Sequence, residues 1–450
     1  MAELKRIVGK TYIGLLVCLL VFNMLILVSD KTDDLQVTYA YIEMLNTAEG
    51  VKSDSKLSTE AATIAWQEYF QKYEINGSDS SDKTAAAKQA REKLMQQAKY
   101  IDNYKGIIED KRQTAILYAT AGTYKKNSFE YNNLLKTQYD LSQIIDADVQ
   151  LSNGLWLEKL YKNNYIHLLT LITCVYTVYM FFSERKNGLY HIVHTGQSGR
   201  GVLFVKRSII LLIQAVVTNV ALYTESAVML LNRYDGVKDL NVAAVSDEYF
   251  ILTSGKLSRI QFLGLIILLS ILANVVLSLV LWAILLCFGN VNIGLFFYCC
   301  ICVADVVIYK VISAKSILQI FKYLNVYYLF FPNKAAEYFN WGCFNIAVSL
   351  LTTTIIVSVF IGILALFASA YISIRKYFTG KMNIVENAIE LILTYIMRLM
   401  VKTNNFGKEV YKILISQGII WILLLLAYIA ANVEPSYGVI YDAKKSYMLG

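Results

Sequence analysis

Long apolar runs constrain the fold of this chain more than any other feature. A helix needs about 20 consecutive apolar residues to cross the hydrocarbon core of a bilayer. Six runs in the first 376 residues approach or exceed that length: 12–28, 160–182, 208–231, 260–288, 293–311 and 343–374. Only 17% of the 450 residues are charged, against about 25% in soluble domains. The sequence therefore predicts an all-α polytopic membrane protein.

Basic residues set the predicted orientation of these spans. Lys5, Arg6 and Lys10 precede the first run, which predicts a cytoplasmic N-terminus. That run is similar to a signal peptide, but the Ser-Asp-Lys at residues 29–31 offers no small-residue cleavage site, so an uncleaved span is favoured. The formal net charge of +8 gathers at span edges. Positive-inside topology explains that charge, and we expect no nucleic-acid partner.

A polar segment separates the first span, within residues 1–30, from the second. Residues 31–162 are rich in Tyr and contain no Cys. Apolar residues recur at helical spacing around Ile64 and Phe70, and residues 85–108 are strong helix formers. We expect a helical extracellular domain here. All seven Cys lie in or beside apolar runs, so the sequence predicts neither a disulfide framework nor a metal site; an external domain without cystines fits a Gram-positive or anaerobic bacterium.

A short basic loop, residues 184–207, connects the second and third runs. It holds five Lys/Arg against one acid, Glu184, and is predicted to be cytoplasmic. Its pattern indicates an amphipathic helix-like middle and then a Gly-rich break at residues 196–201. The Gly spacing is that of a P-loop, but Val202 and Leu203 follow where a P-loop needs Lys and Ser/Thr for phosphates and Mg²⁺. We therefore expect no ATP hydrolysis, and no other catalytic activity, in this chain.

This loop, together with the six spans, resembles the membrane subunit of ABC transporters of the ABC-2 type. The resemblance covers about residues 7–376, and it is to members with an extracellular domain between spans one and two. It implies a six-helix permease half, with spans two to six in residues 163–376 and an outer re-entrant segment at 315–341. The residues that match the coupling loop are Glu184, Arg185, Gly188, Thr195, Gly199, Arg200 and Lys206.

The resemblance also implies partners. A coupling helix at 184–201 would fit a cleft of a separate cytosolic ABC ATPase, and ATP and Mg²⁺ would be used by that ATPase, with no cofactor bound by this chain. A second permease half, the same or a different chain, would complete the transporter among membrane lipids. Residues 377–412 are predicted as a cytoplasmic linker with an interfacial helix, because two Glu and Arg398 are costly in hydrocarbon.

The last residues, 413–450, are predicted as a seventh span with an external C-terminus. Their basic flank and single span are similar to the start of the chain. Our hypothesis is that they begin a second permease half, so that the chain is part of a longer two-half permease.

Two acids within the spans, Glu225 and Asp305, are candidates for a polar substrate path. In one interpretation they face the bundle interior or water, or Asp305 forms a salt bridge with Lys310; in the other they lie near the outer interface, where solvation is cheap. His191 and His194 are spaced i, i+3, but without nearby Cys or carboxylates we interpret them as interfacial imidazoles and expect no metal.

The expected function is that of a permease subunit of an ABC exporter in the plasma membrane. The expected cargo is an amphiphilic peptide, antibiotic or lipid-like molecule. An alternative is a membrane sensor whose external helical domain binds a peptide or envelope ligand, although a sensor needs few spans. A third class, an integral-membrane enzyme, would require a cluster of His, Asp or Glu at the interface, and the sequence offers none.

Overall fold

The computed structural model describes most of the first 375 residues. The described residues are 9–29, 35–52, 57–73, 82–182, 197–252, 255–288, 290–313, 318–343 and 345–375, with four isolated residues between 391 and 398. The interfacial helix predicted within 377–412 and the seventh span predicted in 413–450 therefore lie, apart from those four residues, outside the described part of the chain.

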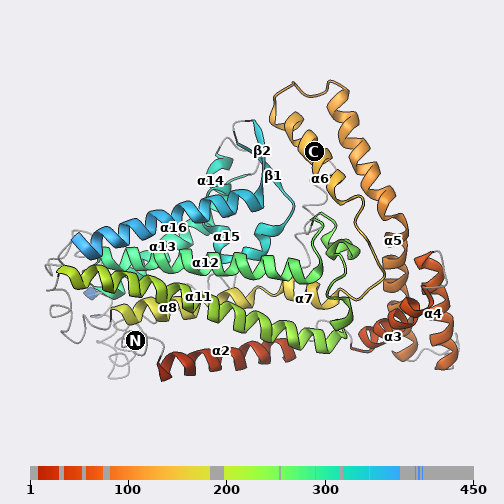
Figure 1. The fold of residues 1–450 in the computed structure, drawn as a ribbon, viewed down its shortest axis with the longest axis horizontal. Helices are drawn as coiled ribbons and strands as arrows, with labels where there is room; N and C mark the ends of the chain where they lie inside the picture. Colours follow the sequence, from red (N-terminus) through yellow and green to blue (C-terminus); the bar gives the residue numbers. More distant parts are fainter. Residues whose placement is uncertain are drawn as a thin grey trace.

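Within the described residues, five helices are long and apolar enough to cross a membrane. They run along the long axis of the molecule, and we call them, with the bent pair described next, the bundle (Figure 1). The five are α2 (Lys10–Ser29), α11 (Gln197–Tyr234), α12 (Arg259–Cys287), α13 (Val291–Val311) and α16 (Leu350–Arg375). Their number and length indicate a helical, multi-pass membrane protein.

A sixth crossing is formed if α7 (Leu155–Lys162) and α8 (Tyr165–Phe181) are counted as one broken span. The two helices meet at 47°. The single span predicted at 160–182 is therefore wrong at its start, because the helix breaks at Asn163 and Asn164.

α12 lies at the centre of the bundle and packs against α8, α11, α13 and α16. Its sequence is apolar on nearly all sides, as expected for a helix with neighbours all round. Ser258 begins it with a capping box: its Oγ accepts the N–H of Gln261, and the Gln261 side chain accepts the N–H of Ser258. At the other end, Trp282 stacks on Phe204 of α11 with ring centroids 5.1 Å apart.

α2 lies at the edge of the bundle. Among its residues only Tyr12, Leu19, Asn23 and Leu27 are buried, on one stripe, while the remaining faces expose large apolar side chains such as Ile13 and Phe22. This distribution is expected for a helix with lipid on its outer side, since lipid is as apolar as the side chains.

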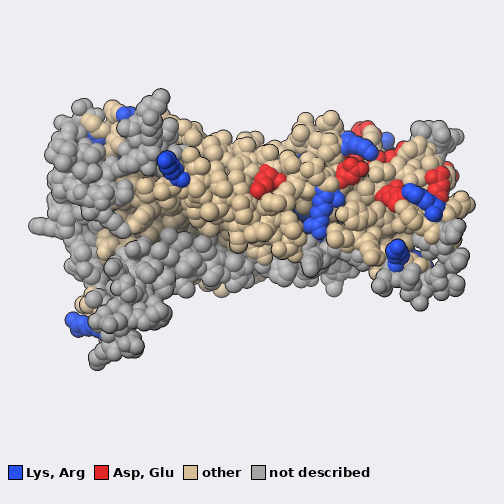
Figure 2. Space-filling view, turned by 90° about the horizontal axis from the view of Figure 1, so that it is seen from below, with Lys and Arg blue, Asp and Glu red and all other residues tan. Residues whose placement is uncertain are grey.

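The four helices described between α2 and α7 form a helical domain at one end of the bundle (Figure 1). They are α3 (Leu35–Lys52), α4 (Ser58–Lys72), α5 (Asp82–Thr120) and α6 (Phe129–Ile144). Buried alanines such as Ala61, Ala65 and Ala90 let α3, α4 and α5 approach closely around Leu94. On the face shown in Figure 2, acidic side chains gather toward this end, and those coloured at the opposite end are Lys or Arg.

Between α13 and α16 the chain forms a short-helix segment and a β-hairpin. We use the first name for α14 (Gln319–Tyr323), α15 (Tyr327–Phe330) and the 3₁₀ helix η4 (Pro332–Ala336). The hairpin pairs β1 (Asn340–Cys343) with β2 (Ile346–Ser349), antiparallel. The span predicted from residue 343 is therefore wrong at its start, and the fold is not purely α-helical.

α11, the helix that follows the basic loop, also differs from expectation in two ways. The Gly-rich break predicted at 196–201 is absent from the described part of that range, because α11 already includes Gly199 and Gly201. The third span, predicted from residue 208, is thus the later part of a 38-residue helix.

Candidate functional site

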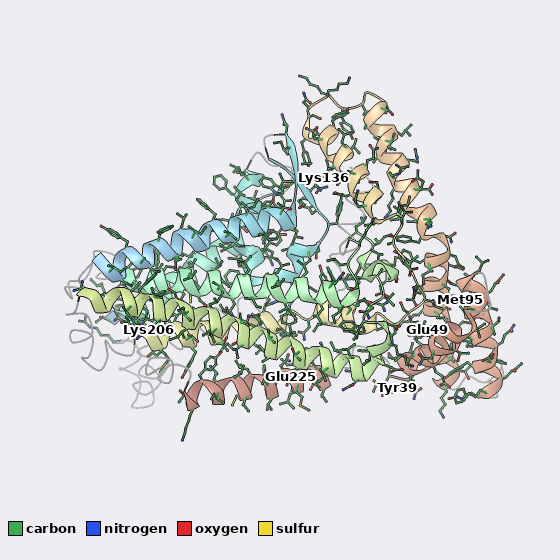
Figure 3. All side chains as sticks on the ribbon, viewed as in Figure 1. Tyr39, Glu49, Met95, Lys136, Lys206 and Glu225 are labelled. Carbon is green, nitrogen blue, oxygen red and sulfur yellow. The ribbon has the colours of Figure 1, made fainter. Side chains whose placement is uncertain are left out.

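The described coupling-loop residues lie in the first turns of α11. These are Gly199, Arg200 and Lys206, and Figure 3 places Lys206 at the end of the bundle away from the helical domain. The Arg200 Nη1 donates to the carbonyl of Ile374 in the last turn of α16, at 3.5 Å, where a cation is favoured by the helix dipole. The other predicted residues lie outside the described chain: Glu184, Arg185, Gly188 and Thr195, and also His191 and His194.

Glu225 lies in α11 and faces α2 (Figure 3). Its Oε2 accepts a hydrogen bond from Asn23 Nδ2 at 2.9 Å, and the same nitrogen lies 2.8 Å from Ser226 Oγ. Asn23 is fully buried. Tyr12 OH and Thr218 Oγ1, 2.8 Å apart, form a second polar contact between the two helices. Glu225 thus helps hold α2 against α11.

Asp305 joins α13 to the short-helix segment. Its Oδ1 accepts the backbone N–H of Val326 at 3.3 Å. Close by, the rings of Tyr309 and Tyr327 stack with centroids 3.7 Å apart. The salt bridge considered with Lys310 is not formed, because residues five apart point to different sides of a helix. Glu225 and Asp305 have separate partners on separate elements, so the structure does not bring them into one site.

A buried polar core connects α8, α11 and α12. The Ser270 hydroxyl of α12 donates to Asn219 Oδ1 of α11 at 2.6 Å. His167 of α8 lies beside this pair, with Nδ1 3.4 Å from Ser270 Oγ and Nε2 3.5 Å from the hydroxyl of Tyr223 on α11. All four side chains are buried. Such polar contacts between spans contribute about 0.6 kcal/mol each on average.

The hydrogen bonds of this core limit what the Ser270 hydroxyl can offer to His167. Asn219 Nδ2 donates to the Ala215 carbonyl at 2.8 Å, so its Oδ1 faces Ser270 and can only accept. The Ser270 hydrogen is therefore used on Asn219, and Ser270 must accept from His167 Nδ1. Asn333 also interacts with the His167 side chain.

A second polar layer lies one to two turns further along the same helices. Gln214 Nε2 of α11 donates to Thr173 Oγ1 of α8 at 2.7 Å. The Ser278 hydroxyl of α12 lies 3.0 Å from Cys174 Sγ and 3.3 Å from Asn274 Oδ1. The polar core therefore extends over several turns between three helices.

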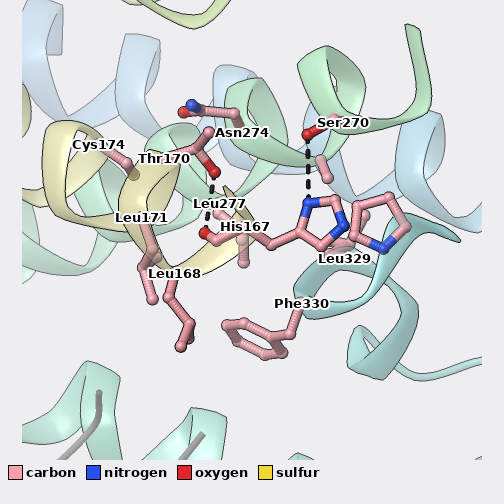
Figure 4. Close-up of a pocket in the computed structure, with 12 residues that line it drawn as sticks. His167, Leu168, Thr170, Leu171, Cys174, Ser270, Asn274, Leu277, Leu329 and Phe330 are labelled. Atoms are coloured by element: carbon pink, nitrogen blue, oxygen red, sulfur yellow. Dashed lines mark hydrogen bonds between the residues drawn. The ribbon is translucent and has the colours of Figure 1, made fainter. Parts of the chain in front are cut away.

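A small pocket opens beside this core, between α8, α12 and the short-helix segment (Figure 4). Its space is enough for about one water molecule. The lining residues are His167, Leu168, Thr170, Leu171, Cys174, Ser270, Ala273, Asn274, Leu277, Leu329, Phe330 and Pro332. The last three belong to the short-helix segment, which therefore forms one wall of the pocket.

Asn333 fastens that wall to the break between α7 and α8. Its Nδ2 donates to the Tyr161 carbonyl at 2.6 Å and to Asn164 Oδ1 at 2.7 Å, and the Tyr161 hydroxyl donates to the Asn333 carbonyl at 2.9 Å. A broken span frees backbone polar groups that lipid cannot satisfy. Asn333 supplies a partner for one such group, the Tyr161 carbonyl, so the break and the short-helix segment stabilise each other.

His167, Asn333 and the polar residues around them were not predicted as site residues. A signal for part of the core is present in the sequence: Ser270, Asn274 and Ser278 recur every four residues in an apolar run and so share one helix face. Polar residues on one face of a span point to the bundle interior. Among the described residues, no group of three or more His, Cys, Asp or Glu is placed to hold a metal ion.

The fold and its buried polar core define a helical multi-pass membrane protein. No family model, no curated protein and no solved structure matches this chain.

Proposed function

We propose that this protein is the permease subunit of an ABC exporter of the ABC-2 type, driven by a separate cytosolic ATPase. The observation that supports it best is the polar core of His167, Asn219 and Ser270 inside otherwise apolar spans. Polar side chains at membrane depth are costly and are found where substrates or ions pass. The short-helix segment that walls the adjoining pocket fits the outer re-entrant segment of such permeases.

In this proposal the basic end of the bundle faces the cytoplasm. The ATPase would push on residues 184–201, the last five of which are the first residues of α11. Arg200 contacts the last turn of α16, so the two helices would move together at that end. The helical domain and the short-helix segment would face outward, with Asp305 holding the segment closed through Val326.

The proposed cargo is amphiphilic: a peptide, an antibiotic or a lipid-like molecule. The pocket supports this class because its lining combines leucines and a phenylalanine with hydroxyl, amide and imidazole groups. A second copy of this chain, or a different permease half, would supply the rest of the transport path.

The test is isolation of the tagged protein in mild detergent with its bound partners. We expect an ATPase to co-purify, and we expect the double variant Gly188→Val with Arg200→Glu to separate ATP hydrolysis from transport while expression stays normal. Lys99→Glu is the matched control, since it makes the same charge reversal at an exposed site on α5. The assignment would be contradicted if the control also lost the coupling of ATP hydrolysis to transport, or if the double variant kept that coupling.

A membrane sensor remains a second candidate because the helical domain contacts the β-hairpin. Asn132 Nδ2 of α6 donates to the Asn345 carbonyl at 2.8 Å, and the Tyr338 hydroxyl donates to Asp140 Oδ2 at 2.9 Å. A ligand bound by the domain would act on the hairpin directly. Purification of the full chain without an ATPase, but with a ligand bound to its helical domain, would favour this function.

A further inference from the structure

The side chain of Asn274 has an unused hydrogen-bond donor beside the pocket. Asn274 is only 3% exposed and lines the pocket from α12. Its Oδ1 accepts from Ser278, but its Nδ2 has no partner. A buried polar group left without a partner costs about 1–3 kcal/mol, so this position favours any molecule that brings an acceptor.

The other polar groups of the pocket are already engaged. The Ser270 hydroxyl donates to Asn219, and the Thr170 hydroxyl donates to the His167 carbonyl at 2.9 Å. The two ring nitrogens of His167 face Ser270 and Tyr223. The donor that remains is the uncharged N–H of Asn274, which favours a ligand that brings an acceptor.

Charge selects the ligand further. None of the lining residues is a Lys, Arg, Asp or Glu, so neither an anionic nor a cationic head group would find a counter-ion there. Transfer of an unpaired charge into such surroundings is far more costly than transfer of a neutral dipole. Leu168, Leu277 and Phe330 offer apolar walls for a hydrocarbon chain.

We propose that this pocket is a binding site for the uncharged carbonyl oxygen of an amphiphilic molecule, with Asn274 Nδ2 as the donor. The inference rests on the proposed function only in taking that molecule to be the cargo. With Leu329, Phe330 and Pro332 in place the pocket admits about one water molecule. Entry of a carbonyl with its chain therefore requires the short-helix segment to move away from α8 and α12.

The experiment uses the full chain in phosphatidylcholine nanodiscs, with Cys174 as the sole cysteine. Cys174 lines the same pocket, so the rate at which N-ethylmaleimide labels it reports occupancy. Four probes of equal chain length are compared: decanamide, decane, decylamine and decanoate. We expect decanamide alone to slow labelling, by about five-fold for one neutral hydrogen bond.

Two variants separate binding from simple loss of folding. Asn274→Leu should abolish protection by decanamide. Thr354→Val should retain it, because Thr354 is a buried residue of α16 with an unpartnered hydroxyl but does not line the pocket. If Cys174 resists labelling in every condition, a decanamide carrying a diazirine provides the measurement, with photolabelled peptides expected from α8 and α12.

Equal protection by decane, or protection that survives Asn274→Leu, would overturn the proposal, and so would photolabel placed elsewhere. These results are independent of the permease assignment. If no ATPase co-purifies but decanamide still protects Cys174, the binding site is supported and the exporter function is contradicted. If an ATPase co-purifies but decanamide does not protect Cys174, the exporter function is supported and this binding site is contradicted.

Discussion

Arg259, fully buried at the first turn of α12, forms a two-pronged ion pair with Asp247: its Nε and Nη2 both lie 3.2 Å from carboxylate oxygens of that residue. Nη2 also donates to Ser152 Oγ at 2.8 Å, and Nη1 to the Asp239 carbonyl at 3.3 Å. We call these four residues the domain–bundle junction, since they join the loop before α7 and the loop after α11 to α12.

Removal of Arg259 should strongly destabilise the protein. Arg259→Met leaves Asp247 buried without its partner, and breaking a buried pair in this way costs about 3–5 kcal/mol. The midpoint of thermal unfolding in detergent measures the loss. The double variant Arg259→Met with Asp247→Leu should recover part of it.

The control for that experiment is Lys238→Met. Lys238 pairs with Asp235 at 3.8 Å on the surface, with both side chains more than half exposed, and exposed pairs contribute about 0–1 kcal/mol. If Arg259→Met unfolds no more easily than the control, the junction does not stabilise the fold.

The stability of the helical domain should fall as the pH rises toward neutral. Burial, and then the charge of Asp239, raise the pKa of Glu49 from 4.5 to about 7; Lys238, Arg259 and Asp235 also face it. Between these two pKa values the folded state holds a proton that the unfolded state has released, so ionisation opposes folding. The stabilisation is complete below pH 4.5 and is lost through pH 7.

Glu49→Gln should therefore reduce the difference in unfolding temperature between pH 5 and pH 8. It should not abolish it, because burial also raises the pKa of Asp247, to about 6. Glu68→Gln, an exposed change on α4, is the matched control. An unchanged pH dependence in Glu49→Gln would show that this carboxyl does not titrate as argued.

Replacement of Asn23 should loosen α2. Asn23→Leu removes the donor to Glu225 and to Ser226 and leaves a half-buried carboxylate without that partner, at a cost of about 1–3 kcal/mol. Thermal unfolding and protease sensitivity of the α2 region measure the effect. Met24→Leu changes the neighbouring exposed side chain and should behave as wild type; equal behaviour of both variants would contradict the role of Asn23.

The long spans could be predicted because the length of an apolar run depends on local sequence alone. The break before α8 could not, since Asn164 is stabilised by Asn333, far away in the chain. The strand β2 was also missed: Ile346 and Val348 continue an apolar run, and a short run of this kind does not distinguish strand from helix. In α11, the cost of about 1 kcal/mol per Gly at Gly199 and Gly201 does not end the helix.

The candidate site was only partly predictable for a related reason. Charge drew attention to Glu225 and Asp305, but their partners, Asn23 and the Val326 N–H, come from elements that only the fold brings near. The role of His167 could not be predicted for the same reason, because its partners Ser270 and Tyr223 come from two other helices. The four-residue spacing within α12 predicts a polar face. Which helix packs against that face depends on the tertiary structure and cannot be read from the spacing.

The length of α11 has a mechanical consequence. Its first turns contact the end of α16 through Arg200, and at its last turn the Tyr234 carbonyl accepts a hydrogen bond from Asn153, next to the domain–bundle junction. Its 38 residues measure about 57 Å at 1.5 Å per residue, against about 30 Å of hydrocarbon. A tilt of about 5° in a rod of that length swings one tip by about 5 Å relative to the other. A force applied at the Arg200 end of α11 would therefore displace the Tyr234 end by rotation of the whole helix.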